Sequence, residues 1–69
     1  MTEFVVIYEQ ATDGSWSARA ADLPVYAVGD TREEAERQVR EAIAVHLDAL
    51  RSRGEPVPEP QTVVGTVTI

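Results

Sequence analysis

A chain of 69 residues with no cysteine and one histidine forms one small domain at most, and it has no disulfides, zinc–cysteine site or thiol chemistry. Twelve carboxylates face six arginines and no lysine, and the formal net charge of −6 disfavours binding to the phosphate backbone of nucleic acids. A domain of about 60 residues buries only about 60% of the surface of its unfolded chain, so we expect extra stability from self-association or a protein partner.

The first third of the sequence predicts an antiparallel β-hairpin. Residues 4–8, FVVIY, are β-branched or aromatic, as is typical of a strand. Asp13 and Gly14 then favour a tight turn. Residues 15–21 alternate between apolar and polar side chains, which indicates a second, half-buried strand. The Asp-Leu-Pro bend at 22–24 ends it, because proline lacks a backbone donor and extends the residue before it.

A short third strand at 26–28 and a long helix follow this bend. Gly29 and Asp30 close the strand, and Thr31 with Glu34 matches a capping box, which marks the first turn of a helix. One apolar stripe runs along about five turns, and Gly54 is placed to end the helix as a left-handed cap. The residues of the stripe are Ala35, Val39, Ala42, Ile43, Leu47 and Leu50. The opposite face carries charges at the spacing of ion pairs, Glu33 to Arg37 and Glu36 to Arg40, which we interpret as a solvated face.

The last part of the sequence predicts an extended connector and a fourth strand. Prolines at 56, 58 and 60 forbid a helix. Residues 62–69 then alternate, with Val63, Gly65, Val67 and Ile69 in one row and Val64 among threonines in the other. The predicted fold is therefore a single α+β domain over 1–69 with the order β-β-β-α-β, in which one helix lies on a mainly antiparallel sheet.

One helix can cover only one face of this sheet. The first strand is apolar on both faces, so Val5 and Ile7 are left on the uncovered side, with one row of the last strand beside them. We expect Val5, Ile7 and Val64 to contribute to an interface between copies, with a two-fold dimer as the default homo-oligomer.

Catalytic chemistry has little support in the sequence. The serines lack a convincing triad, because the single histidine, His46, lies at the edge of the helical stripe. Asp13, Asp22 and Asp30 would be the carboxylates of a metal-dependent nuclease relic, but each already has a structural place in a turn, a bend or a helix start. Trp16 and Tyr8 are expected in the core or an interface. We predict no catalytic, cofactor-binding or metal-binding residues.

Four features in this order resemble the HicB-like antitoxins. They are the opening strand that ends at Tyr8, the Asp13-Gly14 turn with Trp16 after it, the DLP bend, and GDTREEAERQVREAI with its downstream glycine and PVPEP exit. The resemblance implies a partly degenerate ribonuclease-H-like core, self-association, and the inhibition of a small basic RNA-cleaving toxin of HicA type. Many relatives have Gly-Cys where this chain has Val25-Tyr26. Full antitoxins commonly add a C-terminal DNA-binding module, which is not expected here.

The partner-binding residues predicted on this basis are acidic ones around the hairpin and the helix start, Asp13, Glu33 and Glu36, since a basic toxin would meet them. The alternative function is a self-associating structural or regulatory domain with no toxin. The N-terminus lacks the basic residues of a signal peptide, and no apolar run approaches the roughly 18 residues of a membrane span. A cytoplasmic location is therefore expected.

Overall fold

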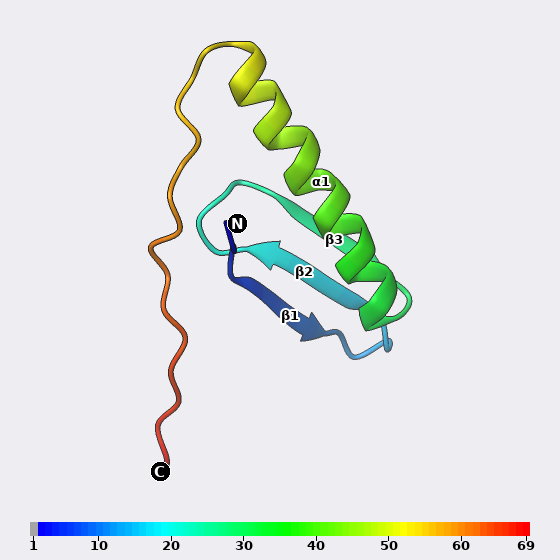
Figure 1. Cartoon of the computed structure of the whole chain (residues 1–69). Coiled ribbons are helices and arrows are strands. Elements are labelled where there is room, and N and C mark those ends of the chain that lie inside the picture. Colours follow the sequence, from blue (N-terminus) through cyan, green and yellow to red (C-terminus); the bar gives the residue numbers. More distant parts are fainter. Residues whose placement is uncertain (1) are drawn as a thin grey trace.

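Three antiparallel strands and one long helix follow one another in the computed structural model, which describes residues 2–69. The strands are β1 (Val6–Gln10), β2 (Trp16–Ala20) and β3 (Tyr26–Gly29), in the sheet order β1-β2-β3. The helix α1 (Arg32–Ser52) lies across one face of the sheet, mainly over β2 and β3 (Figure 1). The structure confirms the predicted α+β class and the order of three strands followed by a helix.

The β1–β2 hairpin forms around the predicted turn. The carboxylate Oδ1 of Asp13 accepts hydrogen bonds from the backbone N–H and the hydroxyl of Ser15 at 2.9 and 2.6 Å, and Gly14 has a φ of 90°, which glycine adopts without strain. β1 begins at Val6, two residues later than predicted, because Val6 pairs with Ala20, the last residue of β2. One further bond continues the pairing, from the N–H of Ala21 to the carbonyl of Val5.

Both ends of α1 are capped as predicted. The Thr31 hydroxyl accepts a hydrogen bond from the N–H of Glu34 at 3.1 Å, whereas the Glu34 side chain accepts one from Gln38. The helix therefore has the first half of the capping box. At the other end Gly54 has a φ of 71°, and the N–H of the next residue reaches back to the carbonyl of Leu50 at 2.9 Å.

Small side chains let the helix approach the sheet closely. Ala18, Ala35 and Val39 form the buried centre of the core. Gly29 is also buried, and a Cβ atom there would lie 2.7 Å from the backbone nitrogen of Ala35. The side chains packed around this centre are Val6, Tyr8, Trp16, Val25, Ala27 and Ile43. Trp16 and Tyr8 thus belong to the core, as predicted.

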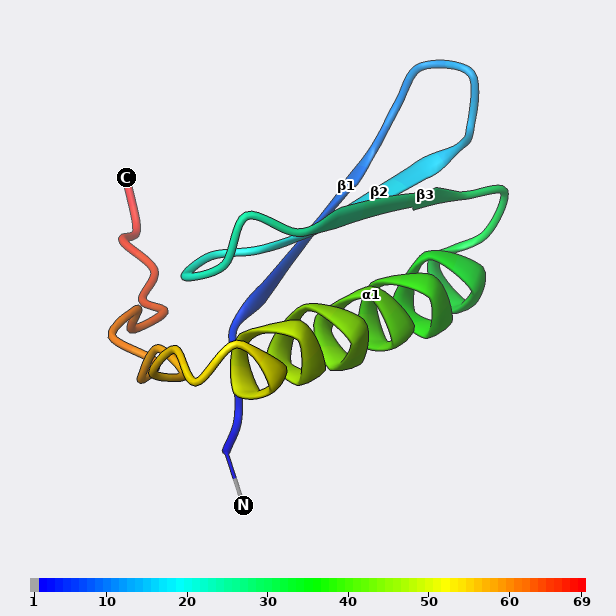
Figure 2. The same ribbon diagram turned by 90° about the horizontal axis from the view of Figure 1, so that it is seen from above.

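The expected fourth strand is not formed within one chain, and this corrects the prediction for residues 62–69. The chain is extended there but pairs with no strand among the described residues 2–69. Figures 1 and 2 both show residues 55–69 running past the end of the sheet and away from β1. The large apolar side chains of the segment are exposed, from 71% at Val64 to complete exposure at Ile69. The physical reason is a contact with Asp22, described below, which holds the segment at the loop between β2 and β3.

Candidate partner-binding surfaces

Two of the three predicted partner-binding residues lie at one end of the sheet. Gln10, Trp16 and Gly29 are neighbours in the strand register, so the β1–β2 turn and the connection from β3 to α1 leave the sheet at the same end. Asp13 lies in the turn and Glu33 in the first turn of α1, and both are exposed. Figure 2 shows the β1–β2 turn extending away from α1, so the two residues lie on separate elements at this end.

We call this end of the sheet, with Asp13 and Glu33, the acidic end; its negative charge is only partly neutralised by arginines. Hydrogen bonds from the side chain and the backbone of Ser15 hold the pKa of Asp13 below its usual value, so Asp13 stays ionised. Glu36, one turn further along α1, forms the predicted ion pair with Arg40 at 3.1 Å. The predicted pair of Glu33 with Arg37 does not form among residues 2–69. Glu33 and Asp13 are therefore available to a basic partner, whereas Glu36 is shared with Arg40.

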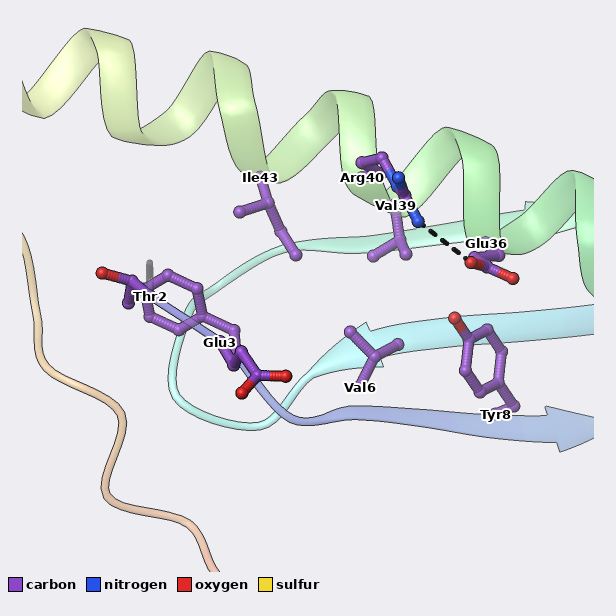
Figure 3. Close-up of a pocket in the computed structure, with 9 residues that line it drawn as sticks. Thr2, Glu3, Val6, Tyr8, Glu36, Val39, Arg40 and Ile43 are labelled. Atoms are coloured by element: carbon purple, nitrogen blue, oxygen red, sulfur yellow. Dashed lines mark hydrogen bonds and ion pairs between the residues drawn. The ribbon is translucent and has the colours of Figure 1, made fainter.

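An open groove of about 430 Å³ runs between β1 and α1. One wall comes from β1 and the residues before it, with Phe4, Val6 and Tyr8, and the other comes from α1, with Val39 and Ile43. Figure 3 shows Val6 and Tyr8 pointing from β1 toward the helix. Thr2, Glu3 and the Glu36–Arg40 ion pair lie along its edge. The groove exists because α1 covers β2 and β3 more closely than β1.

A cation–π contact fixes the helix start over β1. The guanidinium carbon of Arg32 lies 4.9 Å from the centre of the Tyr8 ring, within the range in which such contacts are attractive. One face of the Tyr8 ring is therefore occupied, while its edge lines the groove. This arrangement sets the position of α1 relative to the edge strand.

Asp22, which the sequence placed only in the bend after β2, holds the last segment of the chain in the structure. Its carboxylate accepts hydrogen bonds from the backbone N–H groups of Gln61 and Thr62, both at 3.1 Å, and from the Thr62 hydroxyl at 2.8 Å. The hydroxyl bond, followed by the two N–H bonds, holds the pKa of Asp22 below its usual value. We call these three bonds the Asp22 latch. The latch joins Asp22 to residues 39 and 40 positions later in the sequence, and a contact over this separation cannot be predicted from a local sequence pattern.

The predicted interface residues are only partly brought together. Val5 and Ile7 lie on the face opposite α1, where the register places Tyr26 and Val28 of β3 on the same side. Val5 and Ile7 are half-buried, whereas Tyr26 is 74% exposed. Val64 lies in the extended segment, which both ribbon views place away from β1. This outer face is therefore a mixed surface, in which Arg19 and Glu9 approach within 3.9 Å.

The carboxylates considered for a metal site do not gather. Asp13 precedes β2 and Asp22 follows it, so the two carboxylates lie beyond opposite ends of this strand and cannot share one ion. Within the described residues 2–69 no three histidine or acidic side chains are arranged to hold a metal. His46 is half-buried on α1. The helix that the structure describes is not apolar enough over its length to cross a membrane.

Comparison with known proteins relates the chain to one family. The chain is 31% identical over 67 residues to the UPF0150 protein ssr1765 of Synechocystis, an alignment that covers 96% of this chain and 85% of the relative. No solved structure gives a significant match. The family described as the HicB-like antitoxin of bacterial toxin–antitoxin systems matches residues 4–68, which is nearly the whole chain. The chain belongs to this family of HicB-like antitoxins.

Proposed function

We propose that this protein neutralises a small basic RNA-cleaving toxin of HicA type by binding over the surface with which the toxin holds RNA. The observation that carries the proposal is the pair of exposed carboxylates, Asp13 and Glu33, that lie at one end of the sheet and form no ion pair among residues 2–69. A surface that binds the phosphates of RNA is cationic, and it is complementary to such carboxylates. Family membership supports the antitoxin role.

Inhibition of this kind needs no reacting group from the antitoxin. The acidic end would compete with RNA phosphates for the same basic side chains, and the bulk of the domain would exclude the substrate. The net charge of −6 would also steer the encounter, so association should slow as salt is added. Glu36 would contribute only if the toxin displaced Arg40 from it.

The test is binding kinetics with a short basic protein of HicA type, which is sought in the reading frames next to that of this chain. Reversing three charges, as Asp13→Lys, Glu33→Lys and Glu36→Lys, removes three negative charges and adds three positive ones, which brings the formal net charge from −6 to zero. We expect the association rate constant to fall at least tenfold at about 0.15 M salt, where screening over about 8 Å makes local charges dominate.

A matched control reverses three exposed carboxylates at the other end of the molecule, as Asp48→Lys, Glu55→Lys and Glu59→Lys. This control has the same net charge, and it loses two ion pairs, Asp48 with Arg51 and Glu55 with Arg53, whereas the test variant loses the one between Glu36 and Arg40. We expect its association rate constant to stay within about threefold of the parent value. Equal effects of the two triple variants would show that only overall charge matters, and the proposed site would be wrong.

A second function, a self-associating structural or regulatory domain without a toxin, is favoured by one observation. The chain exposes Val63, Val64 and Val67 in its last segment, together with Tyr26 and Val28 on the outer face. The absence of a neighbouring reading frame for a basic protein, together with failure to capture any basic partner, would favour this function over toxin inhibition.

A further inference from the structure

Two unsatisfied features of this chain complement each other. The first is β1, an edge strand whose outer side pairs with no strand within the part of the chain that the structure describes. Its residues Val6 and Tyr8, with Phe4 just before the strand, line an open groove. The second is segment 63–69, which is extended, apolar in alternate positions and without a strand partner. An uncovered edge and an unpaired strand of this composition both favour β-pairing with another chain.

We infer that two copies of the protein exchange segment 63–69, each adding it as a fourth strand along β1 of the other copy. Alternate side chains of segment 63–69 would point to opposite faces of the enlarged sheet, and each row suits the face that it would meet. Val63, Val67 and Ile69 would enter the groove under α1 beside Phe4, Val6 and Tyr8. Val64 would then fall on the outer face with Val5 and Ile7. The exchange therefore covers the exposed side chains of the segment and the open groove together.

The Asp22 latch explains why the second copy, and not the same chain, supplies the strand. Asp22 lies in the loop between β2 and β3, so the vacant place outside β1 is between two and three strand spacings away, or about 12 Å at ~4.8 Å each. While the Asp22 latch is closed, the chain would need about three or four of residues 63–69 to cross this distance at ~3.4 Å per residue. Only about three or four residues would then be left to pair with its own β1.

The same segment has a suitable length for pairing in another copy. Residues 63–69 span about 23 Å when extended, whereas the five residues of β1 span about 17 Å. The latched segment already leaves the body of its own chain, as Figure 1 shows. A two-fold arrangement, in which each copy gives and receives one segment, closes the assembly at a dimer.

Charge favours a second copy over a basic toxin as the occupant. Glu59 is the last charged side chain, and residues 60–69 carry none. A basic partner would gain nothing electrostatically from this segment, whereas an uncharged strand suits a groove with apolar walls. The exchange does not depend on toxin binding, so it is tested on the isolated protein.

The first experiment measures the dimer dissociation constant by light scattering and sedimentation of the full chain and two variants. Val67→Lys places a charge in the row that faces the groove, and Thr66→Lys places the same charge in the opposite row. Both positions are exposed in the single chain, so circular dichroism should show unchanged folding. We expect Val67→Lys to weaken the dimer at least tenfold and Thr66→Lys to change it by less than about threefold. Equal effects, or a monomeric parent chain, would overturn the exchange.

The second experiment separates exchange from other dimers. In a mixture of isotope-labelled and unlabelled chains, filtered nuclear Overhauser spectra report only contacts between copies. We expect contacts from the Val67 and Ile69 methyl groups to the rings of Phe4 and Tyr8. The same contacts found only within one chain would show that the segment folds onto its own β1. A dimer that lacks these contacts would show association through another face, and either result would refute the proposal.

Discussion

Replacement of Val39 by alanine tests whether the small core holds this fold together. Val39 is 2% exposed and is the largest side chain fully enclosed between α1 and the sheet. Val39→Ala removes two buried methyl groups, worth about 1.6 kcal/mol of transfer free energy, and leaves a cavity that brings the loss to roughly 2–3 kcal/mol. Alanine returns about 0.5 kcal/mol through its higher helix propensity.

Val45→Ala is the matched control, because Val45 lies on the same helix and is 69% exposed. It gains the same helix propensity and loses almost no burial, so we expect a stability change between zero and about +0.5 kcal/mol. The difference between the two variants, roughly 2–3 kcal/mol, then isolates the core. That is a large part of the roughly 3–10 kcal/mol expected for a chain of this length.

Urea denaturation followed by the fluorescence of Trp16, the only tryptophan, measures this difference. With a slope of about 1 kcal/mol per molar urea, the midpoints of the two variants should differ by about 2 M. Both variants must be compared at one protein concentration, because a dimer makes the midpoint depend on concentration. Midpoints that agree within about 0.3 M would refute the assigned core, since burial of Val39 would then contribute nothing measurable.

Three further predictions concern the ends of the elements. Thr31→Ala should lower the free energy of unfolding by about 1 kcal/mol through loss of the bond to the N–H of Glu34, and Thr31→Ser should restore it, as measured by thermal unfolding. Gly29→Ala should cost about 1–3 kcal/mol in the same assay, because its Cβ would meet the backbone of α1, and a neutral result would contradict the close approach. The Asp22 latch lowers the pKa of the folded state below the ordinary value of about 3.9, so the latch should persist above that pH and be lost as the pH falls through the lowered pKa. The amide shifts of Gln61 and Thr62 should report this acid transition, and Asp22→Asn should abolish it.

Local features of the fold were predictable from sequence because they depend on short-range rules. The turn at Asp13-Gly14, the cap at Thr31 and the left-handed Gly54 each follow from the conformational preferences of one or two residues. The start of β1 was predicted two residues early. In the structure β1 begins at Val6, which pairs with the last residue of β2, and the apolar pattern of residues 4–8 does not show where β2 ends.

Features that depend on distant contacts were not predictable in this way. The alternation of residues 62–69 indicates a strand, but it does not say which chain supplies the partner, and within one chain no partner is present. The Asp22 latch joins residues about 40 positions apart. The acidic end was predicted as a set of carboxylates, and only the structure distinguishes Glu33 from Glu36, which is paired with Arg40.

Inhibition of toxin activity tests the proposed function most directly. Cleavage of a labelled RNA by a basic protein of HicA type, taken from a neighbouring reading frame if one is found there, would be followed while this chain is added in increasing amounts. We predict that cleavage stops near an equal molar ratio, and that the Asp13, Glu33 and Glu36 reversal variant needs a large excess to achieve the same effect. Undiminished cleavage at a saturating excess of the folded parent chain would contradict the account.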